Sequence, residues 1–208
     1  MRASLIALAV AAALTTGAAI HAQNTPGMPG QHDAKLVTGG SYAVDPNHTQ
    51  VLFAFNHMGF TQNIGIIASP ASGTLTLDPK ALDKAKVEIT FPVTNIRSGV
   101  SAFDEHLMKD EFFDAAKFPT ASFTSTSVKV DAEDREAEIT GNLTIKGITK
   151  QVTLDADFVG AGTNPMSKKE TVGFSAEAVI KRSDFGLGAY APAIGDAIEL
   201  KIAAAFEK

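Results

Sequence analysis

A two-residue alternation of apolar and polar side chains constrains this chain more than any other feature of its sequence. Phe53 and Phe55 flank Ala54, and the same period recurs in the segments 74–77, 87–93, 121–130, 137–145, 152–158, 171–180 and 198–206. Neighbouring side chains of a β-strand point to opposite faces of its sheet, so each segment is predicted to be a strand with one apolar face. About eight to nine strands at this spacing are typical of an all-β sandwich or barrel.

The apolar faces of these strands must be hidden from water, so the sheet is expected to curl on itself. An eight-stranded closure either fills its interior with its own side chains or encloses one small ligand. The alternation does not distinguish the two outcomes, so core packing and a ligand cavity both stay open for the inward-facing residues. Those residues are Val51, Phe53, Phe55, Val87, Ile89, Phe91, Ile139 and Leu143.

One segment between the predicted strands breaks the alternation. Ser101 and Asp104 have the spacing of a capping box, in which the Ser101 hydroxyl accepts from the Asp104 amide. A short inserted helix is therefore predicted over residues 105–109. Three aromatic residues follow it and need an apolar environment, so we expect them to plug one end of a barrel. They are Phe112, Phe113 and Phe118.

The N-terminal 22 residues have the layout of a secretory signal peptide. Arg2 precedes an apolar run at 5–14, and small residues then lead to Ala22. That run is too short to span a bilayer, and export is predicted. Residues 23–40 are rich in Pro and Gly and are predicted to be a flexible leader. Residues 41–208 are predicted to form one domain.

The composition excludes several classes of partner. The chain has no cysteine, so it has no disulfide, no thiolate metal ligand and no thiol that could carry an acyl anchor. Its net charge of −5 disfavours nucleic acid and anionic lipid surfaces as partners. No later segment approaches a membrane-spanning length, so no stable membrane insertion is expected. No cofactor is predicted.

The polar residues give no recognisable catalytic or metal site. His48, His57 and His106 match no compact zinc spacing, and structural roles are expected for them. His57 shares a face with Phe53 and Phe55, so it is also a candidate contact for a polar lipid head at a barrel mouth.

Two groups of charged residues have structural explanations as well. The carboxylates between residues 104 and 114 lack the order of a calcium loop and suit a solvated face beside a helix. Arg182 and Asp184 are interpreted as a charge pair at a strand end, with contact to a ligand head as the alternative. Hydrolase motifs are absent, so the protein is not expected to be an enzyme.

Four motifs, in order along the chain, resemble those of the YceI-like family. They are YAVDPNHT at residues 42–49, DEHL with FFD at 104–114, GNLTIKGITK at 141–150, and RSDFG with a later GD at 182–196. Thr49 and Gln151 depart from the residues common in the family, Ser and Pro. Thr49 keeps the hydroxyl and Gln151 lies at a hairpin, so neither change weakens the resemblance, which covers residues 42–206.

The resemblance implies an extended, antiparallel, eight-stranded lipocalin-like barrel in the periplasm, with a short inserted helix. It also implies that the interior carries a long polyisoprenoid or a related lipid, such as a quinone precursor or a fatty amide. On this basis the predicted ligand-binding residues are Val51, Phe53, Phe55, His57, Val87, Ile89, Phe91, Phe112, Phe113, Ile139 and Leu143.

Two other functions remain open at this point. The second hypothesis is an interaction module for a membrane electron-transfer partner, and the third is a metal-dependent enzyme. A homodimer is also left open.

Overall fold

The computed structural model describes residues 27–131 and 136–208. The predicted signal peptide and the first part of the predicted leader lie outside the described residues. The strands are β1 (Gly40–Val44), β2 (Gln50–His57), β3 (Thr61–Ala68), β4 (Ser72–Leu77), β5 (Lys86–Pro92), β6 (Ile96–Arg97), β7 (Thr120–Asp131), β8 (Glu136–Ile145), β9 (Ile148–Thr163), β10 (Glu170–Lys181) and β11 (Ala197–Glu207).

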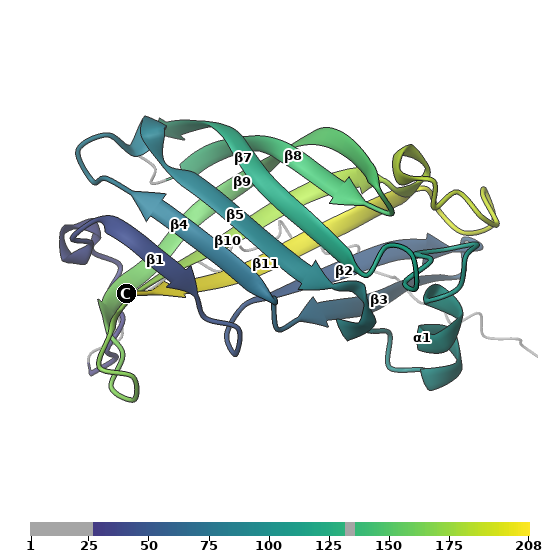
Figure 1. Ribbon diagram of the computed structural model, residues 1–208, viewed down its shortest axis with the longest axis horizontal. Helices are drawn as coiled ribbons and strands as arrows, with labels where there is room; N and C mark the ends of the chain where they lie inside the picture. Colours follow the sequence, from purple (N-terminus) through teal and green to yellow (C-terminus); the bar gives the residue numbers. More distant parts are fainter. Residues whose placement is uncertain (1–26, 132–135) are drawn as a thin grey trace, which may run out of the picture.

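Eight of these strands close an antiparallel barrel. Their order is β1-β4-β5-β7-β8-β9-β10-β11, and β11 pairs back with β1 through Val44 and Phe206. The long strands β7 to β11 lean across the barrel in a continuous wall (Figure 1). The prediction of an all-β, eight-stranded antiparallel barrel with one short helix is confirmed.

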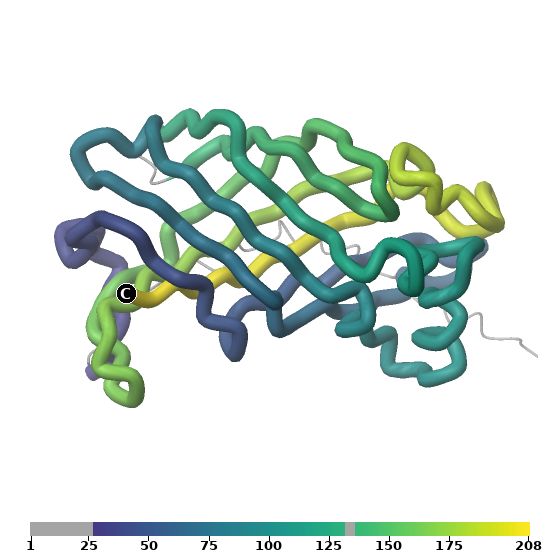
Figure 2. The backbone as a smooth tube through the Cα atoms, in the orientation of Figure 1, coloured from purple at the N-terminus to yellow at the C-terminus, as the bar shows by residue number. Residues whose placement is uncertain are grey.

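A hairpin of β2 and β3 lengthens the barrel at one end. β11 pairs with β1 near its C-terminus and with β2 nearer its N-terminus, so β1 and β2 follow one another along the same strand edge. β3 pairs with β2 over its full length and with the two-residue strand β6. The backbone trace shows this hairpin and the helical segment at the same end of the molecule (Figure 2).

The inserted helix, α1 (Ser101–Leu107), begins one turn earlier than predicted, and the predicted capping box is wrong. Its N-cap is Val100, whose side chain cannot accept a hydrogen bond, and Ser101 already lies within the helix. The Asp104 carboxylate instead accepts from the amide and the hydroxyl of Ser98, both at 2.6 Å. These bonds hold the pKa of Asp104 below its usual range, and they fix the loop that precedes the helix.

The described part of the predicted leader makes specific contacts with the barrel. Gln31 and Ala161 exchange two backbone hydrogen bonds of 2.9 Å. Thr38 donates its amide and its hydroxyl to Glu170, and Val37 packs on the apolar core beside Tyr42. Residues 31–38 therefore lie on the barrel wall in this structure; their flexibility in solution stays a prediction.

Tyr42 lies in the apolar core beside the leader segment. Its hydroxyl donates to Glu170 at 2.7 Å and accepts from the Gly39 amide at 3.0 Å, and the residue has no exposed surface. Burial, followed by the bond to Glu170, raises the pKa of Tyr42 to about 12. The phenol is therefore neutral, as a buried hydroxyl should be.

His48 has a structural partner in the turn after β1. Its Nδ1 lies 2.6 Å from a carboxylate oxygen of Asp45, which is 9% exposed. The hydrogen bond to Asp45 raises the pKa of His48. Burial raises the pKa of Asp45, but the hydrogen bonds from His48 and Asn47 outweigh it and leave that pKa lowered.

These shifts predict a small pH dependence of stability. The His48 contribution is complete below the unfolded histidine pKa of about 6.5 and is lost as pH rises through the higher folded value. The Asp45 contribution is lost as pH falls through its lowered folded value. Because His48 is mostly exposed, we expect wild type to lose at most about 1 kcal/mol between pH ~6 and ~8. Urea unfolding of His48→Gln should show a flatter profile; an unchanged slope would disprove this role.

Candidate functional site

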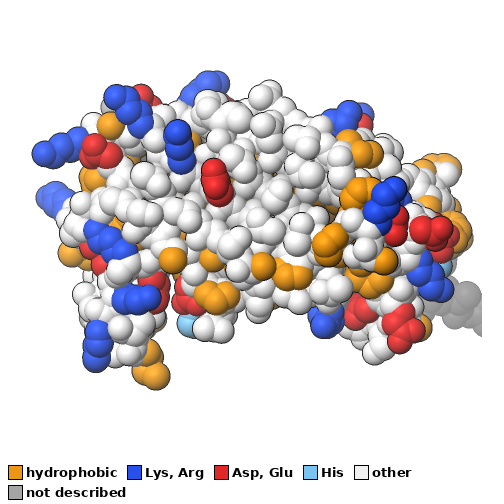
Figure 3. Space-filling model, viewed as in Figure 1, with side chains coloured by type: hydrophobic (Ala, Val, Ile, Leu, Met, Phe, Trp, Pro, Cys, Tyr) orange, Lys and Arg blue, Asp and Glu red, His pale blue; other side chains and the backbone are white. Residues whose placement is uncertain are grey.

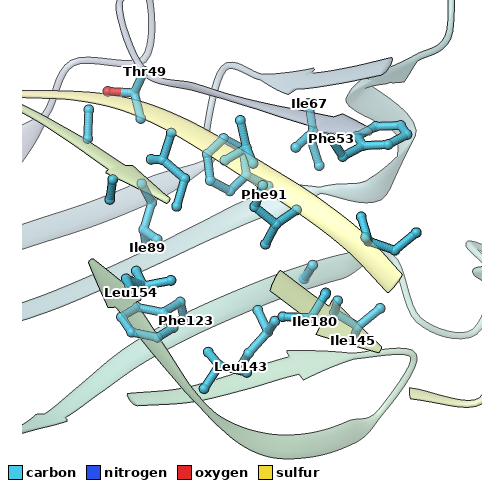
Figure 4. Close-up of a pocket in the computed structure, with 18 of the residues that line it drawn as sticks. Thr49, Phe53, Ile67, Ile89, Phe91, Phe123, Leu143, Ile145, Leu154 and Ile180 are labelled. Carbon is cyan, nitrogen blue, oxygen red and sulfur yellow. The ribbon is translucent and has the colours of Figure 1, made fainter. Parts of the chain in front are cut away.

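The barrel encloses one large apolar cavity of about 1560 Å³. Pockets for drug-sized ligands occupy roughly 300–1000 Å³, so this space suits a larger molecule. Its lining runs from Val37 and Leu82 at one end to Phe112 and Tyr190 at the other, with side chains from every barrel strand except β1. Figure 4 shows aliphatic and aromatic side chains from these strands pointing into a common space. The barrel is therefore hollow.

All eleven residues predicted to contact a ligand line this cavity. They come from β2, β5 and β8 and from the segment after α1, and they are Val51, Phe53, Phe55, His57, Val87, Ile89, Phe91, Phe112, Phe113, Ile139 and Leu143. Their position in the wall follows from the structure, whereas their contact with a lipid stays a prediction. Further lining residues with the same two-residue period are Phe123, Leu154, Ile180, Leu200 and Ile202, and their alternation could have identified them.

Two strand glycines keep aromatic rings against the wall. Phe53 lies directly opposite Gly65 in the β2–β3 pair, and a Cβ at Gly65 would collide with its ring. A Cβ at Gly141 would meet the Phe123 ring in the same way. Glycine in a strand interior permits this close approach. The rings therefore lie flat on the sheet and leave the centre of the barrel open.

A row of alanines widens the cavity further. Ala137, Ala156 and Ala176 are neighbours across β8, β9 and β10, and all three line the space. Their methyl groups reach only a short way inwards, whereas larger side chains at these positions would meet in the middle. This row cannot be predicted from the sequence, because it depends on the register between strands.

Two of the three aromatic residues after α1 pack at the end of the barrel that carries the helix, where they line the cavity without closing it. Phe112 and Phe113 pack with Val93, Ile96 and Leu107. Phe118 does not join them, which corrects the prediction. Its ring lies against Gly147 at the β8–β9 turn and is absent from the cavity lining.

Polar side chains gather in the cavity wall near α1. The lining there includes His57, Gln62, Asn63, Ser98 and His106. His106 Nε2 lies 2.7 Å from Glu111 Oε1, and Glu111 also accepts from the Tyr190 hydroxyl at 3.0 Å. The lining also includes Lys35, Lys86 and Glu136 away from α1, and the wall between is mostly apolar. The side chains near α1 can offer hydrogen bonds to the polar head of an amphiphile.

Arg182 does not pair with Asp184 as predicted. The guanidinium is buried, with 6% of the residue exposed, and donates to the carbonyl oxygens of Gly195, Ala189 and Ile194 at 2.8–2.9 Å and to that of Leu187. Burial lowers the pKa of Arg182. Its role is to hold the loop 186–196 over the barrel end, while Asp184 is exposed.

Two further observations on the described residues concern metal ligands and membrane-spanning helices. Within residues 27–131 and 136–208, no group of three or more His, Asp or Glu side chains is placed to hold a metal ion. In those same ranges, no helix has the length and apolar character needed to cross a membrane.

The sequence of this chain is similar to those of known proteins. The family model described as the YceI-like domain matches residues 42–206. Protein YceI of Salmonella arizonae is 40% identical over 159 residues, which cover 73% of this chain and 81% of that protein.

Two solved structures superpose on the barrel. The first is Burkholderia cenocepacia BcnA, with a TM-score of 0.69 and 23% identity over 78% of this chain and 98% of BcnA. The second is a polyisoprenoid binding domain from Saccharophagus degradans, with a TM-score of 0.61 and 13% identity over 80% of this chain and 97% of that domain. At these identities the two structures show a shared fold. The family match, together with the 40% identical relative, confirms the resemblance predicted from the motifs, and the chain belongs to the YceI-like family.

Proposed function

We propose that this protein is a periplasmic carrier or reservoir for a long isoprenoid-type lipid that lies inside the barrel. The observation that carries the proposal is the continuous apolar cavity of about 1560 Å³, with polar side chains gathered near α1. A linear amphiphile would place its tail along the tube and its head beside His57 and His106. The predicted signal peptide supports the location.

The energetics suit such a ligand. Each buried methylene contributes about 0.8 kcal/mol, so a chain of ~40 carbons is almost insoluble in water and needs enclosure. At a net gain of about 0.3 kcal/mol per heavy atom, ~40 atoms give roughly 12 kcal/mol, which corresponds to nanomolar binding. This function requires no catalytic group, and we propose binding as the whole activity.

The relatives support the same class of ligand. The domain from Saccharophagus degradans, which shares the barrel, is described as polyisoprenoid-binding. That description belongs to the other protein, and at 13% identity it does not determine which lipid this chain takes.

Solvent extraction tests the proposal. Purified full-length protein is extracted with organic solvent, and the extract is analysed by mass spectrometry. We expect a long-chain isoprenoid lipid in an amount close to one per barrel, because the cavity is continuous. An extract that is consistently empty, from a protein that also takes up no added octaprenol, would contradict the carrier and favour an interaction module.

A further inference from the structure

Five exposed apolar side chains surround one end of the cavity. This apolar rim consists of Met58, Phe60, Ile64, Val100 and Tyr190, and each is at least 54% exposed. All of them except Phe60 also belong to the cavity lining. The rim is therefore continuous with the apolar interior. In the view of Figure 3, hydrophobic side chains gather over β3 and towards the end of the barrel that carries α1.

Backbone and ring contacts join the elements that carry the rim. The Met58 amide donates to the Ala193 carbonyl at 2.7 Å, which ties the β2–β3 turn to the loop that carries Tyr190. The Tyr190 ring stacks on Phe112, with centroids 6.0 Å apart. The ring centroids of Phe103, within α1, and Phe55, on β2, lie 6.5 Å apart. The hairpin, the helix start at Val100 and the loop thus frame a single opening.

An exposed apolar cluster of this kind usually marks a surface that contacts another apolar surface. Phe60 is the clearest case, because it is 83% exposed and outside the cavity lining, so neither the core nor a bound ligand explains it. A lipid insoluble in water must enter and leave without crossing solvent. A rim that meets the bilayer and opens into the cavity provides that path.

The charges beside the rim favour a neutral surface. Residues 97–117 contain five carboxylates and the three cations Arg97, Lys109 and Lys117, and Lys146 adds a fourth cation through its bond to the Asp110 carbonyl. The carboxylates are Asp104, Glu105, Asp110, Glu111 and Asp114. An anionic lipid surface would be repelled by this excess of negative charge.

We propose that the apolar rim docks reversibly on a zwitterionic lipid bilayer and that the lipid enters and leaves the cavity through this opening. The inference rests on the proposed carrier function and adds the partner of its site. Docking through a few side chains agrees with the expected absence of stable membrane insertion.

The test measures lipid transfer from vesicles. Delipidated protein is mixed with phosphatidylcholine vesicles that contain octaprenol, the vesicles are removed by flotation, and protein-bound octaprenol is quantified over time by mass spectrometry. Phe60→Ser is expected to slow transfer about tenfold, which corresponds to about 1.4 kcal/mol. Met166→Ser is the matched control, because Met166 is 88% exposed in the β9–β10 loop, outside the rim, and its transfer rate should equal that of wild type.

A parallel measurement separates this inference from the carrier function. Octaprenol presented in detergent should bind wild type and Phe60→Ser equally, because Phe60 does not line the cavity. If neither protein binds it, the carrier function fails, and the docking with it. If both bind it and transfer from vesicles is also equal, the rim has no role in docking.

Two further results would overturn the choice of surface. Faster transfer from vesicles enriched in phosphatidylglycerol would contradict a neutral partner. A dimer of the wild type that Phe60→Ser abolishes, with unchanged transfer, would assign the rim to a second copy of the chain.

Discussion

The Ala176→Trp variant is expected to lose at least about tenfold in affinity for octaprenol, which corresponds to about 1.4 kcal/mol. Ala176 is buried near the middle of β10 and faces the cavity between Ala156 and Ile202 on the neighbouring strands. An indole there would cross the space that a linear lipid occupies. The empty cavity has room for the indole, so the variant should avoid the overpacking cost of about 1–3 kcal/mol that such substitutions have in dense cores.

Binding is measured by titration of delipidated protein with octaprenol in detergent, and folding by urea unfolding. Val179→Trp is the matched control, because Val179 lies on the same strand with its side chain on the outer face and is 68% exposed. The control should bind as wild type does. Wild-type affinity in a folded Ala176→Trp variant would show that the ligand does not occupy the barrel interior.

Replacing Arg182 with Met is expected to lower the free energy of unfolding by about 3 kcal/mol or more. The guanidinium serves carbonyl oxygens of four residues in the loop 186–196, and the substitution leaves these acceptors without a donor in a buried site. A buried polar group that loses its partner costs about 1–3 kcal/mol. Water that reaches the loop would reduce the total, so the estimate stays below the sum of four such losses.

Urea unfolding measures the change. Arg182→Lys should lose less, because its ammonium group reaches some of the same oxygens but lacks the planar array of donors. Lys201→Met removes only an exposed ion pair with Glu177 at 3.4 Å and should change stability by about 0.5 kcal/mol or less. A loss in Arg182→Met no larger than that of Lys201→Met would show that the loop is held by other contacts.

The sequence predicted the barrel well, because strand formation follows from a local period. Phe53, Ile89 and Leu143 belong to segments in which every second residue is apolar, and all three face the cavity. The period also predicts which side of each strand faces inwards. The period gives no information about which residues face one another across the barrel or on neighbouring strands.

That limit explains why the sequence left the hollow interior undecided. Gly65 makes room for Phe53 only because β2 and β3 pair in one register, and Ala156 meets Ala176 only because β9 and β10 do. Register depends on turn lengths and on the closure of the whole barrel, which local patterns do not specify. The sequence shows these residues, but it does not show which residues they face on the neighbouring strands.

The incorrect predictions concern polar partners. The sequence predicts the nearby Asp184 as the partner of Arg182, whereas its partners are backbone carbonyls. Every residue carries a backbone carbonyl, so a sequence does not indicate which of them accepts. The predicted helix cap failed because Asp104 turns back to Ser98, a partner outside the expected motif. Short-range polar motifs have several competing geometries, and tertiary packing selects among them.

A crystal structure of the protein loaded with octaprenol tests the central claim most directly. The account predicts continuous density for one chain that runs between Ile89 and Leu143, with its hydroxyl beside His57 or His106. An empty or water-filled cavity at saturating octaprenol, or density confined to the outer surface, would contradict it.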